Sequence, residues 1–306
     1  MLWLCRSDPE HIHRTVGPMA DQPSWQRKFR RSEIHFEQLA GLVQRFLAAS
    51  PYGAIEEIQE GPDGAVVHSW SGVIRERPPA EWSPIVGDCL NNLRSSLDHL
   101  AWGLAAETGR HTAFPIFGDE SEYKRVTPGR HLKYVRKDAH EFIESLQPFR
   151  HVKGPTAHLL FLLDRLTNDD KHRELIGTEV GVAHIYVGAP AGEKAEGDLL
   201  TFEFEPRDRW YTNGTTLTRY RTSNPGVYVP LQFTFDVAFD PEGPAIGQPL
   251  LTILGTLMLV TWMVLLAFEE RFFAGSIPHL IAPPLEGRAE YVGTDTFAER
   301  TGWRPT

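Results

Sequence analysis

The stretch that decides the fold reads SPIVGDCLNNLRSSLDHLAWGLAAE and runs from Ser83 to Glu107. Ser83 suits the N-cap of a helix, and Pro84 suits its first helical position. The apolar residues of the stretch recur at the spacing of one helical face; they are Leu90, Leu93, Leu97, Leu100, Ala101 and Leu104. The pattern predicts a long amphipathic helix at the centre of the fold.

Three further helices are predicted around this one. Ser32–Ala49 carries a buried face and ends before Pro51, and Thr156–Arg173 carries a leucine stripe. A third helix is predicted over Pro249–Phe273. The segment Gly243–Phe268 carries no charge, its part Leu250–Phe268 is almost continuously apolar, and its length could span a membrane. Threonines and glycine dilute it, and no cluster of Lys or Arg flanks it. We interpret it as a helix that returns to the core of the bundle, with a membrane anchor as the alternative.

Strands are predicted before and after this helical region. Ala54–Gln59 and Ala65–Ile74 are joined by Gly61-Pro-Asp-Gly, a turn sequence that predicts an early β-hairpin. In Leu200–Glu205 and Val227–Phe239, apolar and polar residues alternate, as in half-buried antiparallel strands. The sequence therefore predicts an α+β fold: a bundle of four to five helices, a packed antiparallel β-sheet and an early hairpin.

The same patterns divide the chain into five parts. We expect a disordered extension over 1–24, a helical domain with a hairpin insert over 25–175 and an antiparallel β region over 176–240. A long apolar helix over 241–275 and a peripheral tail over 276–306 follow.

Composition limits the class of protein. Of the 306 residues, 41 % are apolar and 23 % are charged, as is typical of soluble globular proteins. The net charge of −9 disfavours a protein that coats nucleic acid with its whole surface. Cys5 and Cys89 are too few for a disulfide framework or a multi-cysteine zinc site. With no signal-peptide pattern, these features indicate a cytoplasmic protein.

Polar residues on the central helix form the first candidate site. Arg94 and Asp98 are four residues apart and share a face, and Asn91 lies one turn earlier. His99 lies about 140° around a straight helix from Arg94. Both can act on one atom only if the helix is kinked or a second copy supplies one of them, so a homodimer is a candidate assembly.

A second polar segment follows the leucine stripe of Thr156–Arg173. Continuing that stripe reaches Asp169, Asp170 and Arg173, which suggests half-buried charges. Such charges need partners, because burying an isolated charge costs roughly several kcal/mol of folding free energy. We predict that the two helices pack together and join their polar groups into one network. Its candidate members are Asn91, Arg94, Asp98, His99, Asn168, Asp169, Asp170, Lys171, His172 and Arg173.

Three interpretations of this network remain open. It is an ion-pair clamp that fixes helix register in a non-enzymatic structural or interaction protein. Or it is a nuclease site, with Arg holding a phosphate and His serving as acid or base. Or it is a divalent-metal site, whose ligands would be Asp98, Asp169, Asp170, His99 and His172. No HExxH or comparable spacing is present, so we assign no metal or other cofactor.

A basic stretch provides a candidate phosphate-binding patch in this acidic chain. Its cations are Lys124, Arg125, Arg130, Lys133, Arg136 and Lys137. A solvated helix-and-loop face is the alternative interpretation.

Four segments carry a resemblance to known proteins. They are NLRSSLDHL at Asn92–Leu100, FPIF at Phe114–Phe117, LQPF at Leu146–Phe149 and NDDKHR at Asn168–Arg173. Together they resemble a family of uncharacterised bacterial and phage proteins.

The spacing Arg94-Ser-Ser-Leu-Asp-His99 is also similar to the Arg-to-His signature of the HEPN superfamily, helical proteins that include metal-independent ribonucleases. That resemblance implies an RNA substrate and a dimer interface, with Arg94 binding phosphate and His99 as acid or base. Ser95 departs from the Asn, Asp or His that is usual after the Arg.

The β-rich region supports a different class of function. Tyr211, Tyr220 and Tyr228 stand among polar strand residues, and we expect them to be exposed. They would form an interaction surface and make the protein a binding module.

Overall fold

The computed structural model describes residues 22–61, 63–107, 111–172, 179–192, 200–204, 210–239, 243–274 and 280. For 170–172, 179–184, 204 and 210 within these ranges, only the backbone is described. The predicted disordered extension, apart from its last three residues, and nearly all of the predicted tail lie outside the described residues.

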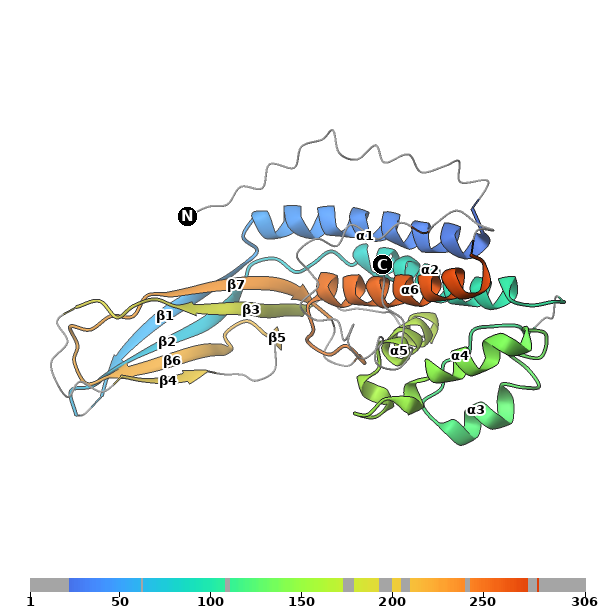
Figure 1. The fold of residues 1–306 in the computed structure, drawn as a ribbon. Coiled ribbons are helices and arrows are strands. Elements are labelled where there is room, and N and C mark those ends of the chain that lie inside the picture. Colours follow the sequence, from blue (N-terminus) through green and yellow to red (C-terminus); the bar gives the residue numbers. More distant parts are fainter. Residues whose placement is uncertain are drawn as a thin grey trace.

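Helices and antiparallel strands together confirm the α+β class (Figure 1). The long helices of the described chain are α1 (Ser24–Ala48), α2 (Trp82–Gly103), α5 (Leu159–His172) and α6 (Leu250–Phe272). Shorter helices are α3 (Glu120–Val126) and α4 (His140–Ser145), and short 3₁₀ turns span Lys137–Ala139, Pro148–Arg150 and Pro155–Ala157.

Helix α2 lies at the centre of the bundle, as its sequence predicts. It packs against α1, α5 and α6, and Leu93, Leu97 and Leu100 are fully buried. Helix α1 begins at Ser24, eight residues before the predicted start at Ser32. Trp25 and Phe29 extend its buried face, but the four cations around Phe29 hide the periodicity in the sequence.

Helix α6 fills the core of the bundle. Within the described residues, it alone is long and apolar enough to cross a membrane, and most of it is buried inside the structure. Its final turn is joined to α1, because Trp25 Nε1 and Gln26 Nε2 donate to Glu269 Oε1 at 2.6 and 2.9 Å. The predicted return of this segment to the bundle is therefore observed.

The strands form two antiparallel sheets. The first, in the order β1-β2-β6-β4, contains β1 (Tyr52–Glu60), β2 (Val66–Ile74), β6 (Thr216–Thr222) and β4 (Leu200–Phe204). The second, in the order β5-β3-β7, contains β5 (Trp210–Tyr211), β3 (Glu179–Val187) and β7 (Leu231–Ala238). The predicted hairpin β1–β2 is thus one edge of the first sheet, and His68 of β2 is paired with Tyr220 of β6.

The strands extend beyond one end of the bundle, whereas α3 and α4 lie toward its other end (Figure 1). We call the strands β1 to β7 the β arm. Strand β7 contacts α1 and α6, and Trp70, Tyr220 and Val229 form a second, smaller apolar core within the arm.

Two details of the β region differ from the prediction. The strand observed within the predicted range Val227–Phe239 is shorter than predicted, because β7 starts only after Pro230. Proline has no N–H to donate to a β-ladder. Tyr211 and Tyr220 are each only 1 % exposed, so their predicted exposure is wrong; the hydroxyl oxygen of Tyr220 accepts from Val229 N at 3.0 Å. Only Tyr228 of the three is exposed, at 43 %.

Candidate functional site

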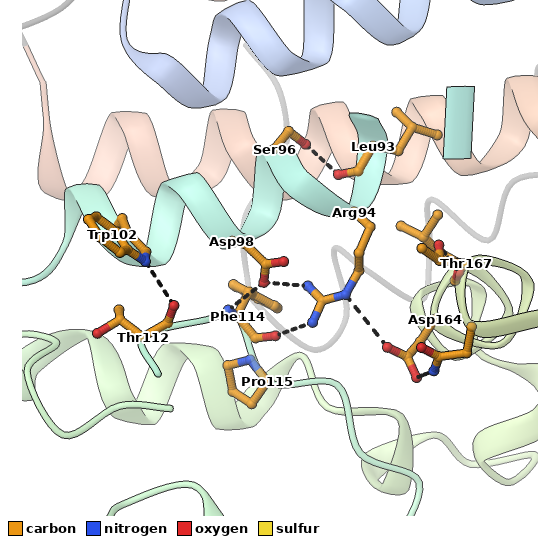
Figure 2. A network of polar contacts seen from close by, with 12 residues as sticks. Leu93, Arg94, Ser96, Asp98, Trp102, Thr112, Phe114, Pro115, Asp164 and Thr167 are labelled. Carbon is orange, nitrogen blue, oxygen red and sulfur yellow. Dashed lines mark hydrogen bonds and ion pairs between the residues drawn. The ribbon is translucent and has the colours of Figure 1, made fainter. Parts of the chain in front are cut away.

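The guanidinium of Arg94 lies at the centre of the candidate site (Figure 2). Its Nη1 donates to Asp98 Oδ1 at 2.8 Å, and its Nη2 donates to the Phe114 carbonyl at 2.8 Å. Its Nε lies 3.6 Å from Asp164 Oδ1 on α5. The Arg94 side chain is only 16 % exposed. The planar cation is therefore occupied on each of its sides by groups of the same chain.

Arg94 and Asp98 together bind both backbone polar groups of one residue. Asp98 Oδ1 accepts the Phe114 N–H at 3.0 Å, while Arg94 donates to the carbonyl of the same residue. Phe114 is fully buried, and its ring contacts Phe268 of α6 edge-on. The ion pair thus holds the segment after α2 in place, so that its aromatic ring reaches the core.

Two more side chains hold the same segment. Trp102 Nε1 donates to the Thr112 carbonyl at 2.9 Å (Figure 2). The fully buried Gln147 donates through Nε2 to the Pro115 carbonyl at 2.9 Å, and its Oε1 accepts the Phe117 N–H at 3.1 Å. Residues from NLRSSLDHL, FPIF and LQPF therefore meet in one hydrogen-bonded network.

Helix α5 completes this network with a residue that the sequence prediction missed. The prediction that α5 packs on α2 is confirmed, but the carboxylate that reaches Arg94 is Asp164. Asn168 belongs to the network as predicted, because its Nδ2 donates to Asp164 Oδ2 at 3.0 Å. In the sequence, Asp164 stands between Leu163 and Leu166 of the leucine stripe. This position beside the buried face was the one indication that its carboxylate could reach α2.

The other predicted residues of α5 take no observed part. Asp169 is half-buried and has no ion pair among the described residues. The side chains of Asp170, Lys171 and His172 are not described, and Arg173 lies outside the described residues. Their predicted roles stay predictions.

His99 lies on a different side of α2 from Arg94. Burial lowers the pKa of its imidazole, and the nearby cations Lys28 and Arg27 lower it further, against the opposing effect of Asp98. His99 therefore faces the start of α1, whereas Arg94 faces the 112–117 segment and α5. Asn91 is half-buried on α2, one turn before Arg94. Within this chain, the structure does not bring Arg94 and His99 together.

His131 is a titratable neighbour of the network that the sequence prediction did not select. Burial lowers the pKa of its imidazole, and Arg130 and Arg94 lower it further. Its Nδ1 is buried without a hydrogen-bond partner, and its ring contacts Phe117 edge-on at 5.8 Å between centroids. The folded protein thus favours the neutral form of this histidine.

Replacing His131 with phenylalanine should make the protein less sensitive to acid. Because the folded-state pKa lies below the unfolded value, this histidine contributes stability above about pH 6.5 that is lost as the pH falls. The variant should lose less stability than wild type between about pH 7.5 and pH 5.5, as measured by urea unfolding. An equal acid loss in wild type and His131→Phe would contradict the assignment.

The predicted phosphate-binding patch lies on α3 and the turns that follow it. Several of its cations are paired: Lys124 with Glu120 at 2.7 Å, Arg125 with Glu122 at 3.7 Å and Arg136 with Asp138 at 2.7 Å. Arg130, Lys133 and Lys137 form no ion pair among the described residues, and Lys133 lies over the ring of Tyr134. Three of the six cations of the patch are thus paired with acidic side chains.

A hollow of about 750 Å³ borders this patch, between α3 and α4. Lys124, Lys137 and Arg150 contribute positive charge to its wall, but Glu141 and Glu144 contribute negative charge. Arg150 is ion-paired with Glu144. This mixture gives no net preference for an anion, so phosphate binding here stays a prediction.

The described residues contain no group of three or more His, Cys, Asp or Glu side chains that could hold a metal ion. Cys89 is the one described cysteine, and burial raises the pKa of its thiol to about 12. It is therefore a core residue rather than a reactive thiol.

Comparisons with protein-family models, with curated proteins and with solved structures found no match. The function is therefore inferred from the contacts described above.

Proposed function

We propose that this is a non-enzymatic interaction protein, in which a helical body held by an ion-pair clamp presents the β arm to a partner. By ion-pair clamp we mean Arg94, Asp98 and Asp164 with the backbone of Phe114. The observation that carries the proposal is that each of the three nitrogens of the Arg94 guanidinium contacts a group of the same chain: Asp98, Phe114 or Asp164.

The same observation disfavours the ribonuclease interpretation. A phosphate bound by Arg94 would compete with two carboxylates and a backbone carbonyl for the guanidinium, and it would weaken the contacts of Asp98 and Asp164 with this cation. Removing one partner of a half-buried ion pair is costly, because the remaining charge stays desolvated. A second protomer that supplied His99 would meet the same obstacle at Arg94.

The surface of the β arm supports an interaction role. Of the nine large apolar side chains that are exposed in the described residues, five lie on the arm or in the segment before β7: Ile55, Ile58, Tyr186, Val187 and Tyr228. Apolar groups gathered on one projecting part of a soluble domain commonly mark a binding surface. Figure 1 shows how far the arm extends from the helices.

An RNA cleavage assay tests this proposal. Wild type and His99→Ala are incubated with a mixed RNA substrate, with and without EDTA, after circular dichroism has verified that both are folded. We expect no cleavage above the buffer control from either protein. EDTA-resistant cleavage that His99→Ala abolishes would overturn the proposal in favour of a metal-independent ribonuclease. EDTA-sensitive cleavage would overturn it in favour of a metal site.

A further inference from the structure

Strand β1 is the edge of its sheet among the described strands, and the charged side chains that it carries are all glutamates. Among the described strands it pairs with β2 alone. Natural edge strands are commonly shielded by Lys, by Pro or by a covering segment, because their free backbone groups can pair with another chain. Within Tyr52–Glu60 there is no Lys, Arg or Pro, and Ile55 and Ile58 are 57 % and 59 % exposed.

A cleft of about 460 Å³ lies beside this edge, where the two sheets diverge. Tyr52 and Ala54 of β1, Trp70 of β2, and Phe233 and Phe235 of β7 contribute to its wall. None of the described residues that line it is charged. Strand β7 is also the last strand of its sheet, so two sheet edges border the cleft.

We propose that the edge of β1 binds an extended, basic peptide segment of a partner protein by strand addition; this rests on the proposed interaction function. Backbone hydrogen bonds to a free edge give affinity, and alternate side chains give specificity. Every second side chain of the added strand enters this uncharged cleft, while the others lie beside Ile55 and Glu57 on the opposite face.

The charges along β1 indicate which kind of peptide would bind there. Glu57 and Glu60 are exposed on β1, and Glu56 is paired with His68 at 2.7 Å. The only charged residue of β7 is Asp236. Arg75 lies at the bundle end of β1, where it donates to the Ser50 and Tyr52 carbonyls. An added strand with Lys or Arg on its outer face complements Glu57, whereas Glu60, three residues further on, lies on the opposite face of β1.

A second copy of the chain fits this edge less well. Antiparallel pairing of two β1 strands would bring together two sets of the same glutamates with no cation on either strand. Like charges opposite one another in a ladder are destabilising. The acidic edge therefore favours a basic partner over self-association.

The test uses a fluorescein-labelled peptide of the length of β1, in which lysine alternates with valine and phenylalanine. Fluorescence anisotropy measures its binding to the full chain. A second peptide carries N-methyl groups on alternate residues, which remove the strand-forming N–H donors. A third has glutamate in place of lysine. We expect saturable binding of the first peptide and at least about tenfold weaker binding of the other two.

Protein variants locate the site. Glu57→Lys combined with Glu60→Lys should weaken binding at least about tenfold, because both charges on the edge are reversed. Glu141→Lys on α4, an exposed change far from the arm, should leave binding unchanged. Equal binding of the N-methylated peptide, equal binding to the β1 double variant, or no binding to wild type would overturn strand addition. None of these outcomes involves RNA cleavage, so they are separate from a failure of the proposed function.

Discussion

Truncating Phe268 to alanine is expected to lower the free energy of unfolding by about 3–5 kcal/mol, enough to leave much of the protein unfolded. Phe268 is fully buried near the end of α6 and contacts the rings of Phe114, Phe142 and Phe272. Its removal opens a cavity where α6, α4 and the 112–117 segment meet. Urea unfolding followed by circular dichroism measures the loss.

Val152→Ala is the matched control, because Val152 is 87 % exposed and its truncation should change stability by less than about 0.5 kcal/mol. If Phe268→Ala unfolded at the same midpoint urea concentration as wild type, α6 would not be the core helix that its burial indicates. A large loss would support the interpretation of the Gly243–Phe268 segment as part of the bundle.

Replacing Arg94 with alanine is expected to cost about 2–3 kcal/mol of unfolding free energy. The change removes a hydrogen bond to Asp98, one to the Phe114 carbonyl and the ion pair with Asp164. Two carboxylates are then left near one another without their cation. Because Asp98 and Asp164 remain partly solvated, the loss should stay below that of a fully buried pair.

Two controls make the Arg94 result specific. Arg94→Lys should recover only part of the loss, because an ammonium group cannot reach three partners in the plane of a guanidinium. Arg125→Ala should cost less than about 0.5 kcal/mol, because the Arg125–Glu122 pair is exposed at 72 % and 54 %. A wild-type stability for Arg94→Ala would show that the network does not hold the fold.

Local pattern predicted the elements of this fold well. The leucine stripe of α2 and the turn residues of the β1–β2 hairpin are written in short segments, so helix and hairpin appear where they were expected. The burial of α6 likewise follows from the uncharged, apolar composition of its residues up to Phe268. Residues that are buried because of their regular spacing along one helix or strand can be identified from a single sequence.

Long-range pairings could not be predicted in this way. Nothing local in the Thr216–Thr222 segment indicates that it pairs with β2, and the burial of Tyr211 and Tyr220 follows from that pairing and the apposition of the sheets. In the candidate site, the i to i+4 pair of Arg94 and Asp98 was predictable. Asp164 was not, because the choice between it and Asp169 depends on how α5 lies against α2.

The predicted RNA partner, the homodimer and the cytoplasmic location stay predictions. We propose instead that the helical body and the β arm have different roles. The polar side chains of α2 bind the 112–117 segment within the helical body, and among the described strands β1 pairs with β2 alone.

The most direct test of the ion-pair clamp is a double-mutant cycle on Arg94→Ala and Asp98→Ala, with free energies of unfolding measured for wild type, both single variants and the double variant. Because the two side chains bind each other and the same backbone of Phe114, we expect a coupling free energy of about 1–2 kcal/mol. Losses that add to within about 0.3 kcal/mol would contradict the clamp and would reopen the catalytic interpretation of Arg94.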